Sequence, residues 1–204
     1  MADEDDPERP PPPTLDRVQA FSDGIFAIAI TLLILPLTDA QVRDGHVVED
    51  LLALQHQFLA LVLSFVVIGR YWLLHHEDLR MMHAAGPRML VANLVFLFFV
   101  VLLPFPTALL GDGDSAAATI IYALAIIATA ASSLGLWWSA ERDDLIAPHG
   151  RRWGRGKYYS VTAVILGFLP SLPLAFVAPE WARVSWALVV PLGLIADRLE
   201  ERRR

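Results

Sequence analysis

Charged and hydroxyl side chains stand at the start of an apolar run near the beginning of the chain. The run "RVQAFSDGIFAIAITLLILPLTD" extends from Arg17 to Asp39 and carries Ser22 and Asp23 in its first turns. A carboxylate is costly to place in lipid, so Asp23 needs partners, a function or both. Two kinds of chemistry fit: a hydrogen-bonded clamp that holds the start of a helix, or a site for a proton or another cation.

Further polar side chains are expected at the same depth as Asp23. The second apolar run ends in "GRYWLLHHED", where Trp72 and His75 are three residues apart and share a helix face. Asn93 lies about one turn beyond the start of the third run. Asp23 can bond to any of these three side chains, and Arg17 can supply a positive charge from below. We favour the clamp over the ion site, and the adjacent letters of "HHED" face different ways, which disfavours a metal site.

The rest of the first run carries one stripe of side chains at helical spacing. The stripe follows the i, i+3, i+4, i+7 pattern, and its members are Ile28, Thr31, Leu32 and Leu35. On spacing alone, packing against neighbouring helices is the favoured interpretation. The alternative is a pore wall, in which several copies of the chain form an apolar constriction followed by a ring of hydroxyls. Pro36 should loosen the outer end of this helix.

The elements that carry these residues are membrane-spanning helices. The chain has 204 residues, 55% of them hydrophobic, which excludes an ordinary soluble domain. Its long continuous runs do not fit the alternating strands of an outer-membrane barrel. The sequence has no cysteine and no basic patch with interleaved aromatics, so neither a disulfide framework nor a nucleic-acid partner is expected. Six spans are predicted in an all-α integral membrane protein: Phe21–Leu37, Leu51–Leu74, Met89–Leu110, Ala116–Ala140, Tyr158–Ala178 and Trp181–Ala196.

The distribution of arginine and lysine predicts the orientation of these spans. Basic residues gather in alternate connections and in the last residues, which places both termini in the cytoplasm. Residues 1–16 are predicted to be a disordered, acidic, proline-rich tail, residues 17–197 a transmembrane domain, and residues 198–204 a basic tail. The basic loop Arg151–Lys157 receives no function. Tryptophans near the predicted span ends read as anchors at the membrane interface: Trp137, Trp138, Trp153, Trp181 and Trp186.

The first half of the chain resembles the transmembrane-protein-175 family of endosomal–lysosomal and bacterial potassium channels. The residues Arg17–Asp23 match its first-helix signature R-x3-F-S-D. "YWLLHH" at Tyr71–His76, Asn93 and "LPFPTALLG" at Leu103–Gly111 follow in the same order. The last three predicted spans match mainly in number and spacing.

The resemblance implies a six-helix subunit without a re-entrant pore loop, not an enzyme, in which four copies of the first helix line one pore. It implies modest selectivity for potassium over sodium, with potassium as the permeant ion. No cofactor and no metal site are expected. The resemblance makes Ile28 the narrowest, gating residue, followed by Thr31, Leu32 and Leu35, and so favours the pore wall over plain packing. It also assigns a polar clamp: Arg17, Phe21, Ser22, Asp23, Trp72, His75 and Asn93. The main alternative is a proton-coupled secondary transporter that uses Asp23 and His75. The composition of this single-repeat chain suggests a bacterial plasma membrane.

Overall fold

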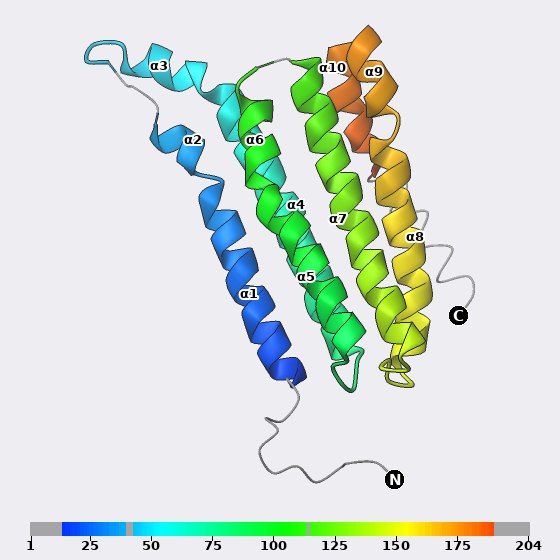
Figure 1. Ribbon diagram of the computed structural model, residues 1–204. Coiled ribbons are helices and arrows are strands. Elements are labelled where there is room, and N and C mark those ends of the chain that lie inside the picture. Colours follow the sequence, from blue (N-terminus) through cyan, green and yellow to red (C-terminus); the bar gives the residue numbers. More distant parts are fainter. Residues whose placement is uncertain (1–13, 40–42, 114, 190–204) are drawn as a thin grey trace, which may run out of the picture.

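The computed structural model describes residues 14–39, 43–113 and 115–189, and in these ranges the regular elements are helices. The long helices lie side by side and slightly inclined to one another, and α1 stands at one edge of the bundle (Figure 1). The helices in chain order are α1 Leu15–Leu32, α2 Leu35–Thr38, α3 Val47–Ala53, α4 Gln55–Arg80, α5 Pro87–Leu102, α6 Pro104–Gly111, α7 Ala116–Arg142, α8 Gly150–Phe168, α9 Ser171–Val177, α10 Pro179–Val184 and the 3-10 helix η1 Ser185–Leu188.

Five helical stretches in the described ranges are long and apolar enough to cross a membrane, in agreement with the predicted membrane fold. They are Leu15–Thr38, Gln55–Arg80, Pro87–Gly111, Ala116–Arg142 and Gly156–Val177, and they correspond to the first five predicted spans. The sixth predicted span, Trp181–Ala196, contains the end of α10 and η1, and its residues 190–196 lie outside the described ranges. Most of the predicted acidic tail and all of the predicted basic tail also lie outside them.

Prolines interrupt two of the spans in their C-terminal halves. Pro36 has no N–H to bond to the carbonyl of Leu32, and α1 ends at Leu32. The N–H groups of Leu33 and Ile34 bond three residues back instead, at 3.3 and 3.4 Å, before α2 begins. The third span breaks in the same way at Leu103, between α5 and the proline-rich α6.

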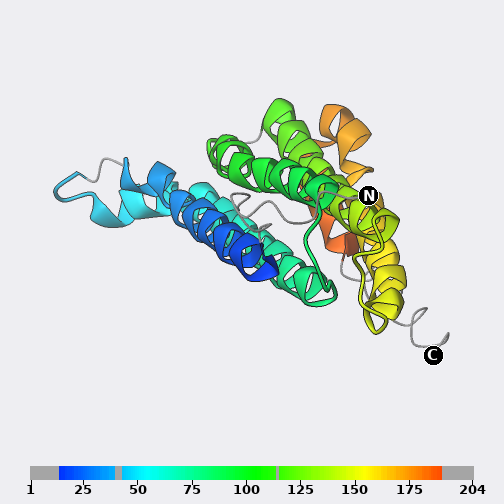
Figure 2. The same ribbon diagram turned by 60° about the horizontal axis from the view of Figure 1, so that its bottom comes forward.

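The packing order of the helices follows from these spans. α1 lies against α4 and α5, α5 lies against α7, and α7 in turn contacts α8 and α9. In the oblique view of Figure 2, α1 and α4 lie side by side, with the green α5 and α7 above them. Fully buried aromatic side chains fill the centre, among them Phe26 of α1, Phe96 of α5 and Tyr122 of α7.

Two tryptophans expected at the interface are buried instead. Trp137 is completely enclosed, and Trp186 is 9% exposed. Trp137 is covered because α8 approaches it at Gly154, where a Cβ atom would lie 2.6 Å from the indole nitrogen. Its N–H donates to Glu141 of the same helix at 2.7 Å, so burial leaves no donor unpaired.

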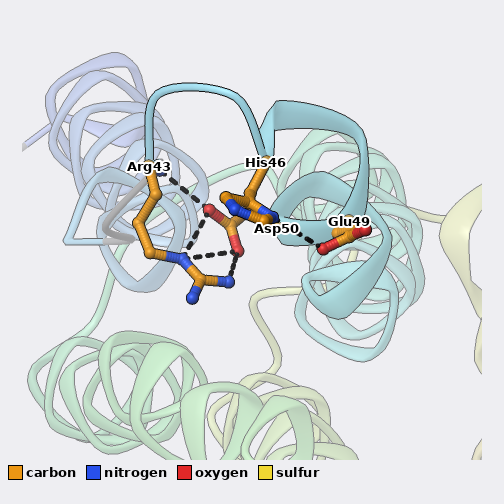
Figure 3. Close-up of polar contacts among 4 residues, drawn as sticks. All are labelled: Arg43, His46, Glu49 and Asp50. Carbon is orange, nitrogen blue, oxygen red and sulfur yellow. Dashed lines mark hydrogen bonds and ion pairs between the residues drawn. The ribbon is translucent and has the colours of Figure 1, made fainter.

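The connection that leads into α3 is held by an exposed ion pair (Figure 3). The backbone N–H and the guanidinium of Arg43 both donate to the carboxylate of Asp50, at 2.8 and 2.6 Å. The side-chain hydrogen bond from Arg43, with the backbone bond, lowers the pKa of Asp50. The chain turns between the two residues at Gly45, whose φ of +83° suits glycine.

Candidate functional site

Helix α1 has one face packed against the bundle and one face open. The packed face follows helical spacing and consists of Val18, Ser22, Phe26, Ala29 and Leu33. Small side chains at Ser22 and Ala29, both fully buried, allow the neighbouring helices to approach α1 closely. The open face therefore lies on the side of α1 that is turned away from α4 and α5.

The stripe identified in the sequence lies on the open face. Ile28 is 57% exposed and Leu35 is 51% exposed, and Thr31 and Leu32 between them are exposed too. Packing within one subunit therefore does not account for this stripe. The Thr31 hydroxyl donates to the carbonyl oxygen of Ile28 at 2.9 Å. Because its hydrogen is used in this way, the hydroxyl oxygen offers its lone pairs outward.

Asp23 is bound to one of its three predicted candidate partners. Trp72 of α4 donates its indole N–H to the Asp23 carboxylate at 2.8 Å. Asp23 is half-buried, so this bond is made at the edge of the packed face. Arg17 lies exposed on α1, and among the described residues it forms no ion pair with Asp23. The expected pairing of Asp23 with the positive charge of Arg17 is therefore not found among the described residues.

A second hydrogen bond joins α1 to α5. Asn93 donates through its side-chain nitrogen to the Ser22 hydroxyl at 3.2 Å, and Ser22 in turn donates to the carbonyl of Val18 at 2.8 Å. Both side chains are almost completely buried. The bond thus lies behind the Asp23–Trp72 bond, inside the bundle.

His75 does not join this set of hydrogen bonds. It is 2% exposed and lies between the rings of Phe26 and Phe96, with centroid distances of 5.8 and 5.1 Å. Neither of its nitrogens has a hydrogen-bond partner among the described residues. Asp23 and His75 therefore do not bond to each other in the described structure.

The adjacent histidine supplies a contact that the sequence analysis missed. His76 and Gln19 are hydrogen-bonded through Nδ1 and Nε2 at 3.0 Å. Gln19 precedes Asp23 by four residues, and His76 follows Trp72 by four, so two bonds lie one turn apart on the same pair of helices. This matched spacing of four residues on each helix is the sequence signal that could have predicted the Gln19–His76 bond. We call the six bonded side chains the polar base: Gln19, Ser22, Asp23, Trp72, His76 and Asn93.

A buried ion pair joins α4 to α8 near the same end of the bundle. The ammonium of Lys157 contacts the carboxylate of Asp78, and the two residues are 9% and 2% exposed. The Lys157 ammonium also lies 5.8 Å from the centre of the Trp137 ring. The sequence analysis placed Lys157 in a basic loop, whereas it lies at the start of the third turn of α8. No set of three or more histidine, aspartate or glutamate side chains in the described ranges is arranged to hold a metal ion.

These features define a helical membrane protein whose first helix is held at its start by hydrogen bonds and exposes an apolar face along its length. Comparison with known families gives the particular assignment. The family described as the endosomal/lysosomal potassium channel TMEM175 matches residues 17–104. A potassium channel of Chamaesiphon minutus is 35% identical over 153 residues, which are 71% of this chain and 75% of the relative. The chain belongs to the TMEM175 family, a family of ion channels.

Two further comparisons agree with this assignment. A potassium channel of Streptomyces collinus is 38% identical over 132 residues, which cover 62% of this chain and 64% of that relative. The crystal structure of a lysosomal potassium-selective channel TMEM175 homolog from Chamaesiphon minutus superposes with a TM-score of 0.70 at 27% identity. That superposition covers 89% of this chain and 97% of the other. The fold therefore extends well beyond the residues that the family match covers.

Proposed function

We propose that this chain forms a potassium-selective cation channel in which four copies place α1 around one central pore. The observation that carries the proposal is the open apolar face of α1, beside an opposite face that is fully packed. Relatives named as potassium channels support it. Copies arranged around a closed symmetry axis bring identical faces together, so four open faces can enclose a path across the membrane.

Ile28 forms the gate in this proposal. Four isoleucine side chains that meet on the axis exclude water, and a dry apolar constriction blocks ions. A small rotation or outward shift of α1 widens the ring and lets water enter. Ile28 suits this role because it is 57% exposed within one subunit.

Thr31 provides the polar contact next to the gate. Its oxygen keeps lone pairs free, since its hydrogen is donated to the carbonyl of Ile28. A cation that has lost part of its hydration shell at the gate can be contacted by four such oxygens. Potassium loses water more easily than sodium, so this arrangement favours potassium. The preference is modest, because no ring of backbone carbonyls replaces the whole hydration shell.

The polar base holds α1 so that its open face keeps one direction. Bonds at 2.8 Å to α4 and 3.2 Å to α5 resist rotation of α1 about its own axis. Phe21 is 52% exposed, and Arg17 is exposed on the same helix. These two residues of the predicted clamp are therefore free to contact a neighbouring subunit in the proposed tetramer. The arginine and lysine distribution supports cytoplasmic termini, and the bacterial relatives support a bacterial plasma membrane.

The test is current through the full chain reconstituted in a planar bilayer, with potassium on one side and sodium on the other. A reversal potential shifted toward that of potassium is expected. Ile28→Asn should raise the current about tenfold, which corresponds to about 1.4 kcal/mol removed from the barrier, and Ile28→Ala should raise it less. Ile121→Ala is the matched control, because Ile121 is also exposed but lies on α7. Equal currents from the wild-type and both Ile28 variants would remove Ile28 from the gate.

A further inference from the structure

An open groove of about 720 Å³ lies between α5 and α7, apart from the open face of α1. It is found where α5 begins and α7 ends, at the lower end of the bundle in Figure 1. We call it the α5/α7 groove and define it by its principal lining residues: Arg88, Val91 and Val95 of α5, and Gly135, Trp138 and Arg142 of α7.

The length of the groove matches one leaflet of a bilayer. On α5 the lining extends from Pro87 to Val95, which is roughly 12 Å along the helix axis. On α7 it extends from Ser132 to Arg142, roughly 15 Å. The hydrocarbon core of a bilayer is about 30 Å thick, so the groove reaches from the charged end of the bundle to about the midplane.

The wall of the groove presents an apolar surface to an occupant. Val91 is 63% exposed and Val95 is 46% exposed, so both present methyl groups to whatever fills the space. The groove also contains Ser132 and Ser139, but their hydroxyls donate to carbonyl oxygens of their own helix at 2.9 and 2.7 Å. With these donors satisfied, a hydrocarbon chain meets no unpaired hydroxyl hydrogen along α7.

The mouth of the groove carries two arginines and a tryptophan. The guanidinium of Arg142 lies over the Trp138 ring at 5.3 Å from its centroid, and Trp138 is 53% exposed. Arg88 donates one N–H to Asp143 at 2.6 Å, yet its side chain is 68% exposed. A guanidinium has five N–H donors, so both arginines retain groups that can bind phosphate oxygens. Tryptophan at the end of a span suits the level of the lipid headgroups.

We propose that the α5/α7 groove binds an anionic phospholipid, with one acyl chain along Val91 and Val95 and the phosphate at Arg88 and Arg142. The charge of the mouth complements a phosphodiester, and the apolar wall at membrane depth excludes free phosphate as the main occupant. Basic residues between transmembrane helices recognise anionic lipids through this combination of contacts. The site is separate from the proposed conduction pathway, so the protein would bind an anionic lipid in addition to the permeant cation.

Trp138 makes the site measurable, because brominated acyl chains quench nearby indoles. The full chain is reconstituted in vesicles that contain either brominated phosphatidylglycerol or brominated phosphatidylcholine at equal mole fraction. The quenching due to Trp138 is obtained by subtracting the signal of Trp138→Phe. We expect brominated phosphatidylglycerol to quench Trp138 at a lower mole fraction than brominated phosphatidylcholine. The ratio of the two mole fractions measures the preference for the anionic lipid, and Arg142→Gln and Arg88→Gln should each reduce this ratio about fivefold. Arg80→Gln is the matched control, since Arg80 is an exposed arginine that does not line the groove.

A steric variant tests the groove without a change of charge. A Cβ atom at Gly135 would meet nothing within 4 Å, so Gly135→Leu extends into open space and does not strain the helix. This variant should abolish the Trp138 quenching by brominated phosphatidylglycerol. Equal quenching by both lipids would overturn the proposal. So would a preference for phosphatidylglycerol that is the same in the Arg142→Gln and Arg80→Gln variants. Absence of Trp138 quenching by either lipid in the wild-type would also overturn it and would indicate that another copy of the chain covers the groove.

Discussion

Neutralising one member of the Asp78–Lys157 pair should be among the most damaging single changes in the described part of the chain. The two side chains are 2% and 9% exposed, and they join α4 to α8. Asp78→Asn keeps the size of the side chain but leaves the Lys157 ammonium without this negative charge. Breaking a buried ion pair in this way costs about 3–5 kcal/mol, because the remaining charge stays desolvated.

The same reasoning predicts that the two single losses do not add. Lys157→Met retains most of the lysine stem and removes the charge, so in the double variant neither charge remains to be solvated. The coupling between the two positions should therefore be at least about 2 kcal/mol. Glu77→Gln is the control: its pair with Arg80 has side chains 37% and 62% exposed, and such a surface pair contributes about 0–1 kcal/mol.

The measurement is equilibrium unfolding in mixed micelles, titrated with a denaturing detergent. Trp137 reports on this region directly, since its ring lies 5.8 Å from the Lys157 ammonium. The free energies of unfolding of the wild-type, the two single variants and the double variant form one cycle. If the two single losses sum to that of the double variant, or if Asp78→Asn costs no more than Glu77→Gln, the pair is not the buried charge interaction described here.

Three further predictions concern α1 and the exposed loop. Trp72→Phe removes the donor that bonds Asp23 at 2.8 Å and should lower the free energy of unfolding by about 1 kcal/mol, measured in mixed micelles beside the control Trp138→Phe. Thr31→Ala should reduce the potassium preference, and an unaltered reversal potential in a potassium–sodium gradient would exclude Thr31 from selectivity. Because Arg43 lowers the pKa of Asp50, their pair stabilises the loop above the ordinary aspartate pKa and is lost as the pH falls through the lowered value. Hydrogen exchange of the Arg43 backbone amide should therefore become faster in acid in the wild-type than in the Asp50→Asn variant. The same pH dependence in the two proteins would contradict this prediction.

The sequence was sufficient to predict an all-α membrane fold, because apolar runs of span length are a strong signal. The periodicity of α1 predicted which side chains share a face, although not whether that face would be packed. The break after Leu32 followed from Pro36, whose missing N–H cannot be replaced within a regular helix. Antiparallel spans brought Trp72 near the depth of Asp23, since Asp23 lies in the N-terminal half of α1 and Trp72 in the C-terminal half of α4.

The remaining contacts depend on how helices rotate and approach one another, which single-sequence patterns do not specify. His75 was an obvious candidate partner for Asp23, yet the rotation of α4 turns it between two phenylalanine rings and presents His76 to α1. Lys157 was hidden in a run of basic residues. It is buried because Gly154 allows α8 to approach α7 closely.

The internal hydrogen bond of Thr31 also affects how a single copy of the chain can sit in a bilayer. Between Gly24 and Leu32, Thr31 is the sole polar side chain, and its hydrogen is already donated to the carbonyl of Ile28 at 2.9 Å. The open face of α1 therefore offers surrounding lipid no unsatisfied donor along this stretch. A newly inserted subunit can remain in the bilayer with this face against acyl chains, without a chaperone to shield it. In the proposed tetramer, this face of α1 would exchange its contacts with lipid for contacts that are equally apolar.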